Sequence, residues 1–440
     1  MKSSINRRTL LKGAAIATTA TAIGSASPVF AAPAYLRQSG DITLEVWGGV
    51  PAENGPQEVC DAFTEATGIK VNYTRYVNDD TGNTQLDTAL QGGTPIDAFF
   101  TYSVPRLGQR IAASATLDLT PYITADTDVK AWTDATAGIF TYQDKYFSLP
   151  TTIEPGFVFI NQRLLDEAGA TVPAAGWTTD DYVALAEQLS SDNVFGMYTP
   201  SDTAAQKLGP DRWYKAGGTE SNFDAPEFSE ARVLHRQLIE AGTAFPHDEV
   251  LAQNLRSYAQ TPFLTEQDVL WINSSFSLRF VSDKEQYPHD FVTTFAPLPV
   301  PTGVEAPFNT GGINNWLLGK ADSKNPDAVW QFIKHFLTEG AIPMLRAGKI
   351  PAFPGTEAST IVEGILGPDR DTLYDVAAYE ASVITPVVPL ITDTITTGSA
   401  EISQIIQGLD DRFLIGEIEI EEWVTEAKSQ SDAAIAAAAG

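Results

Sequence analysis

The sequence has little cysteine and little positive charge. Its 440 residues include one cysteine, Cys60, and 28 Lys and Arg against 56 Asp and Glu, which gives a formal net charge of −28. A single thiol excludes an intrachain disulfide, so the fold depends on its hydrophobic core. The shortage of basic residues argues against binding to nucleic acid or anionic lipid, because both need clustered Lys and Arg. The acidic excess reflects either solubility in a salty habitat or a site for a cationic ligand.

Residues typical of metal and nucleophile chemistry are also scarce. The four histidines show no zinc-ligand spacing, and neither a G-x-S-x-G elbow nor a P-loop occurs; they are His235, His247, His289 and His335. Cys60 lies at helical spacing between Val59 and Phe63, which predicts a buried, inert thiol. We therefore expect neither metal nor cofactor. The 56 acidic residues guarantee chance carboxylate pairs, so an exported glycosidase stays open as an alternative.

A long apolar run is missing everywhere except near the start. Four basic residues up to Lys12 precede an uncharged run over 13–26, and small residues follow at Val29-Phe30-Ala31, which predicts a signal peptide over residues 1–31. The pair Arg7-Arg8 resembles a twin-arginine export signal. We expect a periplasmic or extracellular protein. Since no cysteine lies near the cleavage site, we do not expect a lipid anchor.

What is present is an alternation between strand and helix periods. Apolar residues alternate with polar ones at 42–46 and 69–73 and run continuously at 96–100, while helical patterns around Val59 and Leu86 separate these segments. This β-α-β-α-β order predicts a parallel sheet that is covered on both faces, with ligands at the carboxyl ends of its strands. A length of 440 residues suits two or three domains.

The middle of the chain predicts a second α/β unit. Residues 157–160 have the pattern of a buried strand, and Thr178-x-x-Asp181 is typical of a capping box at a helix start. Asn325 followed by Pro326 predicts the start of another helix, with Asn325 as its cap. After Pro389 the pattern is largely helical, and we expect the alanine-rich end, 433–439, to fray.

Five stretches, taken together in their order and spacing, carry a family resemblance. They are Leu44-Glu45-Val46-Trp47; Pro95-Ile96-Asp97-Ala98-Phe99; Tyr146-Phe147-Ser148-Leu149-Pro150 running to Ile160-Asn161; Phe291 to Pro299; and Gly311-Gly312-Ile313-Asn314 leading to Asn325 through Phe332. The chain resembles the sugar-capturing extracellular solute-binding proteins of ABC importers, the family that includes the maltose-binding protein. It departs from the family where Asp144 replaces a turn glycine.

The resemblance implies an α/β, two-lobed periplasmic-binding-protein fold with hinge strands and a central cleft. Its boundaries would place 32–153 in lobe 1, 154–308 in lobe 2, 309–340 back in lobe 1, and 341–440 mainly in lobe 2 as helices. A protein of this family has no catalytic activity, takes a small-molecule ligand and has membrane permease subunits as partners. We further expect a monomer that does not bind nucleic acid.

Candidate ligand-binding residues lie at strand ends and in loops, because a sugar needs flat aromatic surfaces for its C–H face and fixed polar groups for its hydroxyls. The resemblance places Phe276 at the family's stacking position and Glu154 at a hinge glutamate that reaches ligand. The full set is Trp47, Gly48, Gly49, Tyr102, Glu154, Trp271, Asn273, Ser274, Phe276, Gly311, Gly312, Asn314 and Trp316. Alternatives stay open: a solvated carboxylate for Glu154, packing for Tyr102, and core positions for Trp271 and Trp316.

The resemblance favours a carbohydrate as the ligand. The acidic composition leaves a polyamine or another cationic solute as the alternative on the same fold, held by carboxylates and aromatic rings. A ferric-ion site of clustered tyrosines has no support, since no Tyr-Tyr pair occurs.

Overall fold

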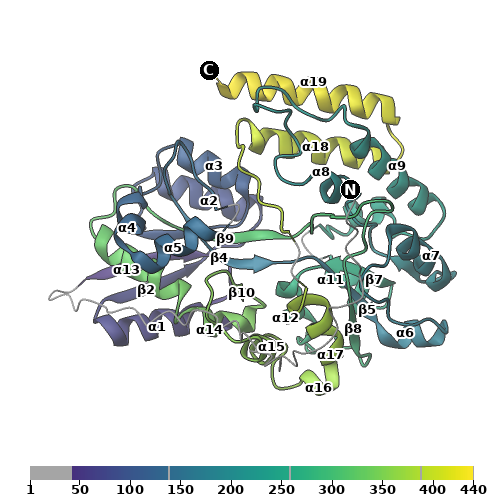
Figure 1. The fold of residues 1–440 in the computed structure, drawn as a ribbon, viewed down its shortest axis with the longest axis horizontal. Coiled ribbons are helices and arrows are strands. Elements are labelled where there is room, and N and C mark those ends of the chain that lie inside the picture. The colour runs from purple at the N-terminus through teal and green to yellow at the C-terminus, as the bar shows by residue number, and fades with distance from the viewer. Residues whose placement is uncertain (1–41, 137–138, 257–258, 387–388, 440) are drawn as a thin grey trace, which may run out of the picture.

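The computed structural model describes residues 42–136, 139–256, 259–386 and 389–439. The predicted signal peptide over 1–31 therefore lies outside the described residues. The described chain forms two α/β lobes that lie side by side (Figure 1). No helix among the described residues has the length and apolar character needed to cross a bilayer.

Lobe 1 contains a six-stranded sheet in the order β10-β4-β9-β3-β1-β2. The strands are β1 (Thr43–Gly48), β2 (Lys70–Arg75), β3 (Ala98–Thr101), β4 (Leu149–Glu154), β9 (Gly312–Gly319) and β10 (Ile350–Pro351). β1 pairs parallel with β2 and β3, whereas β9 runs antiparallel to β3 and β4. The three strands of the predicted β-α-β-α-β opening are parallel, as expected, and the complete sheet is mixed because β9 re-enters it from the other lobe in the opposite direction.

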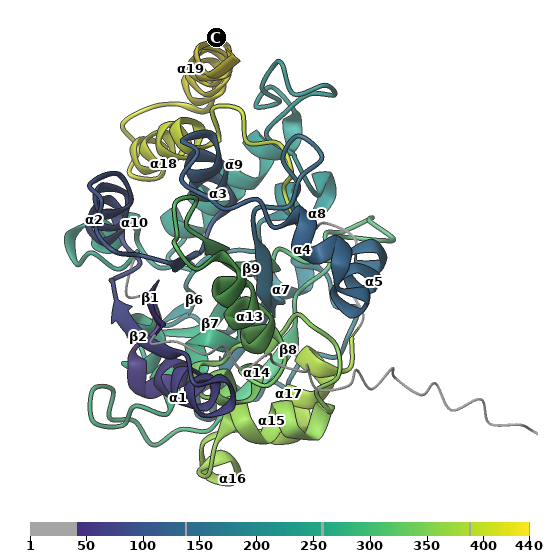
Figure 2. The same cartoon turned by 90° about the vertical axis from the view of Figure 1, so that its left-hand side faces the viewer.

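Helices cover both faces of this sheet. They are α1 (Pro56–Thr67), α2 (Asp80–Gln91), α3 (Val104–Ala112), α4 (Thr120–Ala125), α5 (Thr127–Ala135), α13 (Pro326–Leu337) and α14 (Ala341–Met344), with the short η1 (Ala52–Asn54) and η3 (Leu345–Ala347). One core joins β1 to α1, α4, α5 and α13, and another joins β3 and β9 to α2 and α3. Figure 2 shows this lobe from its free side, with α1 below the sheet and α2 and α3 above it.

Lobe 2 is built around a four-stranded sheet in the order β6-β7-β5-β8. The strands are β5 (Phe157–Asn161), β6 (Phe195–Met197), β7 (Asp268–Asn273) and β8 (Thr293–Pro297). The helices are α6 (Gln162–Glu167), α7 (Thr179–Leu189), α8 (Thr203–Leu208), α9 (Pro226–Glu240), α10 (His247–Ala252), α11 (Gln260–Leu264), α12 (Leu278–Val281), α15 (Ala358–Leu366), α16 (Arg370–Leu373) and α17 (Val376–Tyr379), with η2 (Ser275–Ser277) and η4 (Glu380–Ile384).

The last two helices, α18 (Ser399–Leu414) and α19 (Ile420–Ala439), pack on each other and on α9 of lobe 2. α18 also contacts α3 of lobe 1, so this pair of helices lies across the top of both lobes (Figure 1). The alanine-rich end was expected to fray, and this prediction is wrong. α19 continues to Ala439, and Ala434 and Ile435 are buried against the core that contains Trp423.

Local sequence signals explain several helix ends. α1 stops at Gly68, which adopts a left-handed φ of 80° that favours glycine. α7 starts with the predicted capping box, in which Thr178 and Asp181 satisfy each other's backbone N–H groups. α13 begins at Pro326 as predicted, but the side chain of Asn325 makes no capping hydrogen bond. Instead the backbone N–H of Asn325 donates to Ser323 Oγ over 3.2 Å.

The chain passes between the lobes through neighbouring segments. β4 leads directly into β5, and residues 309–312 lead back into β9. The sequence expectation ended the second visit to lobe 1 at residue 340, whereas β10 still pairs with β4 of the first sheet at Ile350 and Pro351. A further segment then follows the same crossing, because Asn309 N–H donates to the Pro389 carbonyl and Ile391 N–H to that of Gly311. The boundaries assigned to each lobe stay a prediction.

Candidate functional site

In lobe 1 the candidate site begins at the carboxyl ends of three strands. β1 ends at Gly48, β2 at Arg75 and β3 at Thr101, and the parallel pairing brings these ends to one edge of the sheet. The backbone N–H of Gly49 donates to the Tyr102 hydroxyl over 2.7 Å. Gly48, Gly49 and Tyr102 are therefore brought together, and their predicted contact with ligand stays a prediction.

Gly48 packs closely against the side chain of Tyr73, which would have to shift to admit a larger residue. A Cβ atom there would lie 2.5 Å from the hydroxyl oxygen of Tyr73. Trp47 lies one residue earlier and is partly buried against the core formed by α2 and α3. Its ring therefore contributes to packing within lobe 1, and the proposed site does not include it.

The crossing strands supply a polar cluster around Glu154, which is the last residue of β4. Lys349 Nζ lies 2.7 Å from Glu154 Oε1, and the Asn315 side chain donates to the same oxygen over 2.8 Å. The Asn314 side chain donates to Oε2 over 3.3 Å. Burial alone would raise the pKa of Glu154, but the charge of Lys349 and these hydrogen bonds outweigh it, so the pKa lies below its usual range. Glu154 is thus an ionised, fixed carboxylate.

Lobe 2 contributes an aromatic ring to this cluster. Phe276 lies in η2, directly after β7, and is partly buried. Lys349 Nζ lies 5.3 Å from the centroid of its ring, and Arg279 Cζ lies 5.7 Å from it. The neighbouring polar residues act locally, since the Ser274 N–H donates to Asn273 Oδ1 over 2.8 Å. Phe276 is linked to Glu154 indirectly, because Lys349 lies beside both the Phe276 ring and the Glu154 carboxylate.

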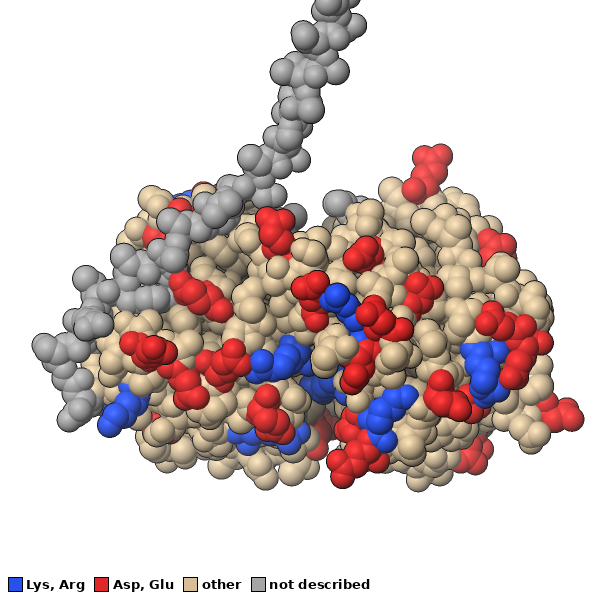
Figure 3. All heavy atoms as spheres, turned by 90° about the horizontal axis from the view of Figure 1, so that it is seen from below, with Lys and Arg blue, Asp and Glu red and all other residues tan. Residues whose placement is uncertain are grey.

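A small cavity in lobe 1 lies beside Lys349 and Asn315. Its lining combines aromatic rings and polar side chains, including Tyr73, Tyr102, Thr152, Asn315 and Lys349. Seen from below, basic side chains gather near the middle of the molecule, with acidic side chains on either side (Figure 3). The site therefore offers flat rings, amides, a hydroxyl and charged groups drawn from both lobes.

Two predicted aromatic residues lie elsewhere. Trp271 is 1% exposed and packs between Phe159 and Phe263 in the core of lobe 2. Trp316 is 2% exposed and lies in the core formed with α2 and α3. The structure places both in the core positions that the sequence left open, so neither ring face is available to a ligand.

Gly311 and Gly312 act through close backbone packing at the crossing. A Cβ atom at Gly311 would lie 1.8 Å from the Glu154 carbonyl oxygen, and one at Gly312 would lie 2.5 Å from that of Ile391. These glycines let the crossing segments approach each other. Both glycines lie near Glu154, and a ligand-binding role for them stays a prediction.

The sequence analysis missed three residues that the structure brings to the cluster: Arg279, Asn315 and Lys349. Arg279 follows Phe276 by three residues, a spacing that puts two side chains on one helical face, so a helix prediction there could have found it. Asn315 follows Asn314 directly on β9. Lys349 carries no local signal, because only the return of the chain after α14 brings it to Glu154.

Groups suited to other chemistry are inert or scattered. Burial and the charge of Asp61 raise the pKa of Cys60 to about 12, which agrees with the predicted inert thiol. Burial and the nearby charges of His247 and Arg232 lower the pKa of His235 to about 4. Within the described ranges, no group of three or more His, Cys, Asp or Glu residues is arranged to hold a metal ion.

Solved structures show the same architecture. The ABC substrate-binding protein of Listeria monocytogenes in complex with cycloalternan aligns with a TM-score of 0.72 and 20% identity, over 90% of this chain and 100% of that one. A sugar transporter from Rhizobium etli in an open conformation gives 0.69 and 17%, over 89% and 99%. The sugar-binding protein MalE of Xanthomonas citri gives 0.66 and 18%, over 90% and 98%.

At these identities the structural likeness shows the fold. No curated protein matches this chain in sequence at a significant level. The sequence profile of the family described as bacterial extracellular solute-binding protein matches residues 51–342, which is more than half of the chain. Because this match covers more than half of the chain, the protein belongs to the family of bacterial extracellular solute-binding proteins, and its two-lobed fold agrees with that assignment.

Proposed function

We propose that this protein is the substrate-binding component of an ABC importer and captures a carbohydrate between its lobes. The observation that supports this is the cluster of Phe276, Glu154 and Lys349, in which a ring from lobe 2 meets fixed polar groups of the crossing strands. A pyranose ring matches such a site, because its C–H face stacks on an aromatic ring and its hydroxyls bind carboxylates and amides.

Capture works by closure of the lobes. A ligand that contacts Phe276 from lobe 2 and the strand ends of lobe 1 favours the closed arrangement over the open one, because both sets of contacts form only when the lobes approach. The permease subunits of the importer then recognise the closed form. Asn314 and Asn315 lie on β9, so their amide groups stay in place with the lobe 1 sheet when the lobes close.

The two alternative functions fit the cluster less well. A polyamine needs unpaired carboxylates, whereas Glu154 is paired with Lys349 and Arg279 lies close by. A glycosidase needs a carboxyl group that stays protonated until it donates to the leaving group. The pKa of Glu154 lies below its usual range, which suits hydrogen-bond acceptance and makes it a poor general acid.

The proposed binding site is tested by replacing Phe276 with Ala. In a thermal-shift and calorimetric screen of mono- and oligosaccharides, polyols and polyamines, we expect a sugar to raise the melting temperature of the wild-type protein. Phe276→Ala should weaken that binding by about 1–3 kcal/mol because stacking area is lost. Phe276→Tyr retains the ring and serves as the matched control, with affinity close to that of the wild type. Equal affinity in a folded Phe276→Ala protein would remove this residue from the site.

We also propose export in the folded state through a twin-arginine signal to the periplasm or cell exterior. The adjacent Arg7 and Arg8 before an uncharged segment support this. Replacing both with Lys should retain the precursor in the cytoplasm, as followed by immunoblotting of cell fractions. Normal export of that variant would instead favour the general secretory route.

A further inference from the structure

The basic residues at the junction of the lobes are not balanced by acidic ones. Lys349 is paired with Glu154 over 2.7 Å. Arg279 of α12 and Arg75 at the end of β2 make no ion pair with any described residue. Arg75 is exposed to solvent, whereas Arg279 and the paired Lys349 both lie beside the Phe276 ring, which makes an unusual cationic spot in a protein with a net charge of −28.

Arg279 is the more confined of the two. Its Cζ lies 5.7 Å from the ring centroid of Phe276 and 4.7 Å from that of Phe280, and the side chain is partly buried. Burial and the charge of Arg75 lower the pKa of Arg279, while Tyr102 and Glu154 act in the opposite direction. A guanidinium in such surroundings is costly unless an anion neutralises it.

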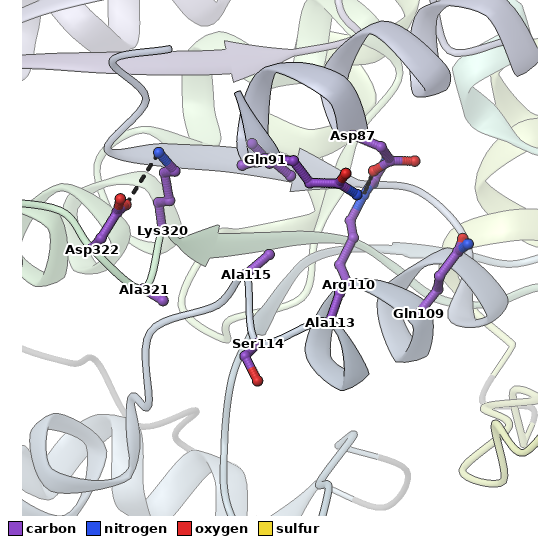
Figure 4. A pocket seen from close by; sticks show the side chains of 11 residues that line it. Asp87, Gln91, Gln109, Arg110, Ala113, Ser114, Ala115, Lys320, Ala321 and Asp322 are labelled. Carbon is purple, nitrogen blue, oxygen red and sulfur yellow. Dashed lines mark hydrogen bonds and ion pairs between the residues drawn. The ribbon is translucent and has the colours of Figure 1, made fainter. Parts of the chain in front are cut away.

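Buried basic residues elsewhere in the chain have that anion within the protein. Arg110 Nε lies 2.7 Å from Asp87, and its other nitrogens donate to Thr101 and Asn83. Lys320 lies 3.1 Å from Asp322. Both pairs line a pocket of about 320 Å³ on lobe 1, where each basic side chain points toward its acidic partner (Figure 4). Arg110 and Lys320 thus each have a carboxylate partner within the protein, whereas Arg279 beside Phe276 has none among the described residues.

We propose that the missing anion belongs to the ligand and that this protein captures an acidic, carboxylate-bearing sugar such as an oligouronate. The proposal rests on the proposed function and names its substrate class. The sugar ring stacks on Phe276, and its carboxylate accepts hydrogen bonds from the guanidinium of Arg279. The planar fork of arginine matches a carboxylate with two parallel bonds, and Arg75 adds long-range attraction from lobe 1.

The experiment compares matched ligands and matched variants by titration calorimetry. The ligands are di- and trigalacturonate and xylan-derived aldouronates, each beside its carboxyl-reduced counterpart, in which the carboxylate is replaced by a hydroxymethyl group. We expect an acidic sugar to bind the wild-type protein at least about tenfold more tightly than its reduced counterpart, because a charge-assisted bond to arginine is lost on reduction. Arg279→Gln should remove that preference, because it should weaken binding of the acidic sugar far more than binding of its reduced counterpart.

Arg163→Gln is the control for the loss of one positive charge, because Arg163 lies on α6 of lobe 2 and pairs with Glu167 over 2.7 Å. It should retain the preference for the acidic sugar. Preference for neutral sugars, or equal loss for both ligands in Arg279→Gln, would overturn this inference and leave the proposed function intact. Binding of spermidine without binding of any sugar would overturn both.

Discussion

Asp268 begins β7 inside lobe 2 and is 0% exposed. Neither of its carboxyl oxygens has a hydrogen-bond partner among the described residues. Tyr182 lies close by but donates its hydroxyl hydrogen to the Thr199 carbonyl over 3.0 Å. Burial therefore raises the pKa of Asp268 well above its usual range. A carboxyl group in this position stays protonated in the folded protein far above the pH at which it ionises in the unfolded chain.

The pH dependence of stability follows from that shift. The folded-state pKa is raised, so the contribution of Asp268 to stability is fully present below the unfolded pKa and is lost as pH rises toward the folded value. Asp268→Asn removes this titration while it retains the size of the side chain. We expect the variant to be more stable than the wild type at pH 7, by about 1–3 kcal/mol, with a smaller difference at pH 4. Urea unfolding of the two proteins at pH 7 and pH 4 measures both stability differences. A difference that does not change with pH would contradict a protonated Asp268 in the folded protein.

At the same scale, sequence reasoning located some site residues and missed others. Glu154 ends a strand and Phe276 follows one, both in motifs whose order resembles the family, and the structure brings both to one cluster. Trp271 and Trp316 lie within strands, where period-two alternation cannot say which face is core. Lys349 becomes a neighbour of Glu154 only through tertiary return of the chain, a contact between residues 195 apart in sequence.

Among the elements, α18 contacts α3 of lobe 1 and α9 of lobe 2. Its apolar face packs in the core that contains Phe223 of lobe 2 and Trp423 of α19. The segment that leads into it contacts α3 of lobe 1, where a Cβ atom at Gly108 would lie 2.5 Å from Thr396. The helical character of this region was predictable from its period, whereas its place across both lobes was not, because amphipathicity does not name the partner of an apolar face.

Two helical glycines provide a matched pair of tests. Gly408 in α18 has open space around a Cβ atom, whereas Gly108 in α3 has Thr396 within 2.5 Å. Alanine gains about 1 kcal/mol over glycine inside a helix from propensity. Gly408→Ala should therefore raise the free energy of unfolding by about that amount. Gly108→Ala should not, because the new Cβ atom clashes with the Thr396 side chain and offsets the propensity gain. Urea unfolding of the two variants compares them directly, and equal stabilisation would mean that α3 and the segment before α18 are not in close contact.

For the whole molecule, the crossing between the lobes decides how far they can move. The side chain of Asn309 clamps two of its segments: its Oδ1 accepts from the N–H groups of Gly156 and Gly311 over 2.7 and 2.8 Å, and its Nδ2 donates to the Gly156 carbonyl over 2.9 Å. The order of strands and helices predicted two lobes, but a strand period does not indicate that β9 is antiparallel. That direction depends on the route of the chain through the second lobe, which local patterns do not encode.

Hinge closure makes a prediction about molecular dimensions. Saturating sugar should lower the radius of gyration of the wild-type protein in small-angle X-ray scattering, because a ligand held by both lobes stabilises the closed arrangement. Asn309→Ala removes three hydrogen bonds from the crossing and should cost about 1–3 kcal/mol of stability. It should also increase the radius of the ligand-free protein and weaken binding, yet reach the wild-type radius when saturated. Asn309→Asp retains the two accepted bonds, so its stability and ligand-free radius of gyration should lie between those of the wild type and Asn309→Ala. An unchanged radius on ligand binding to the wild type would mean that capture occurs without closure, and Asn309 would then act on stability alone.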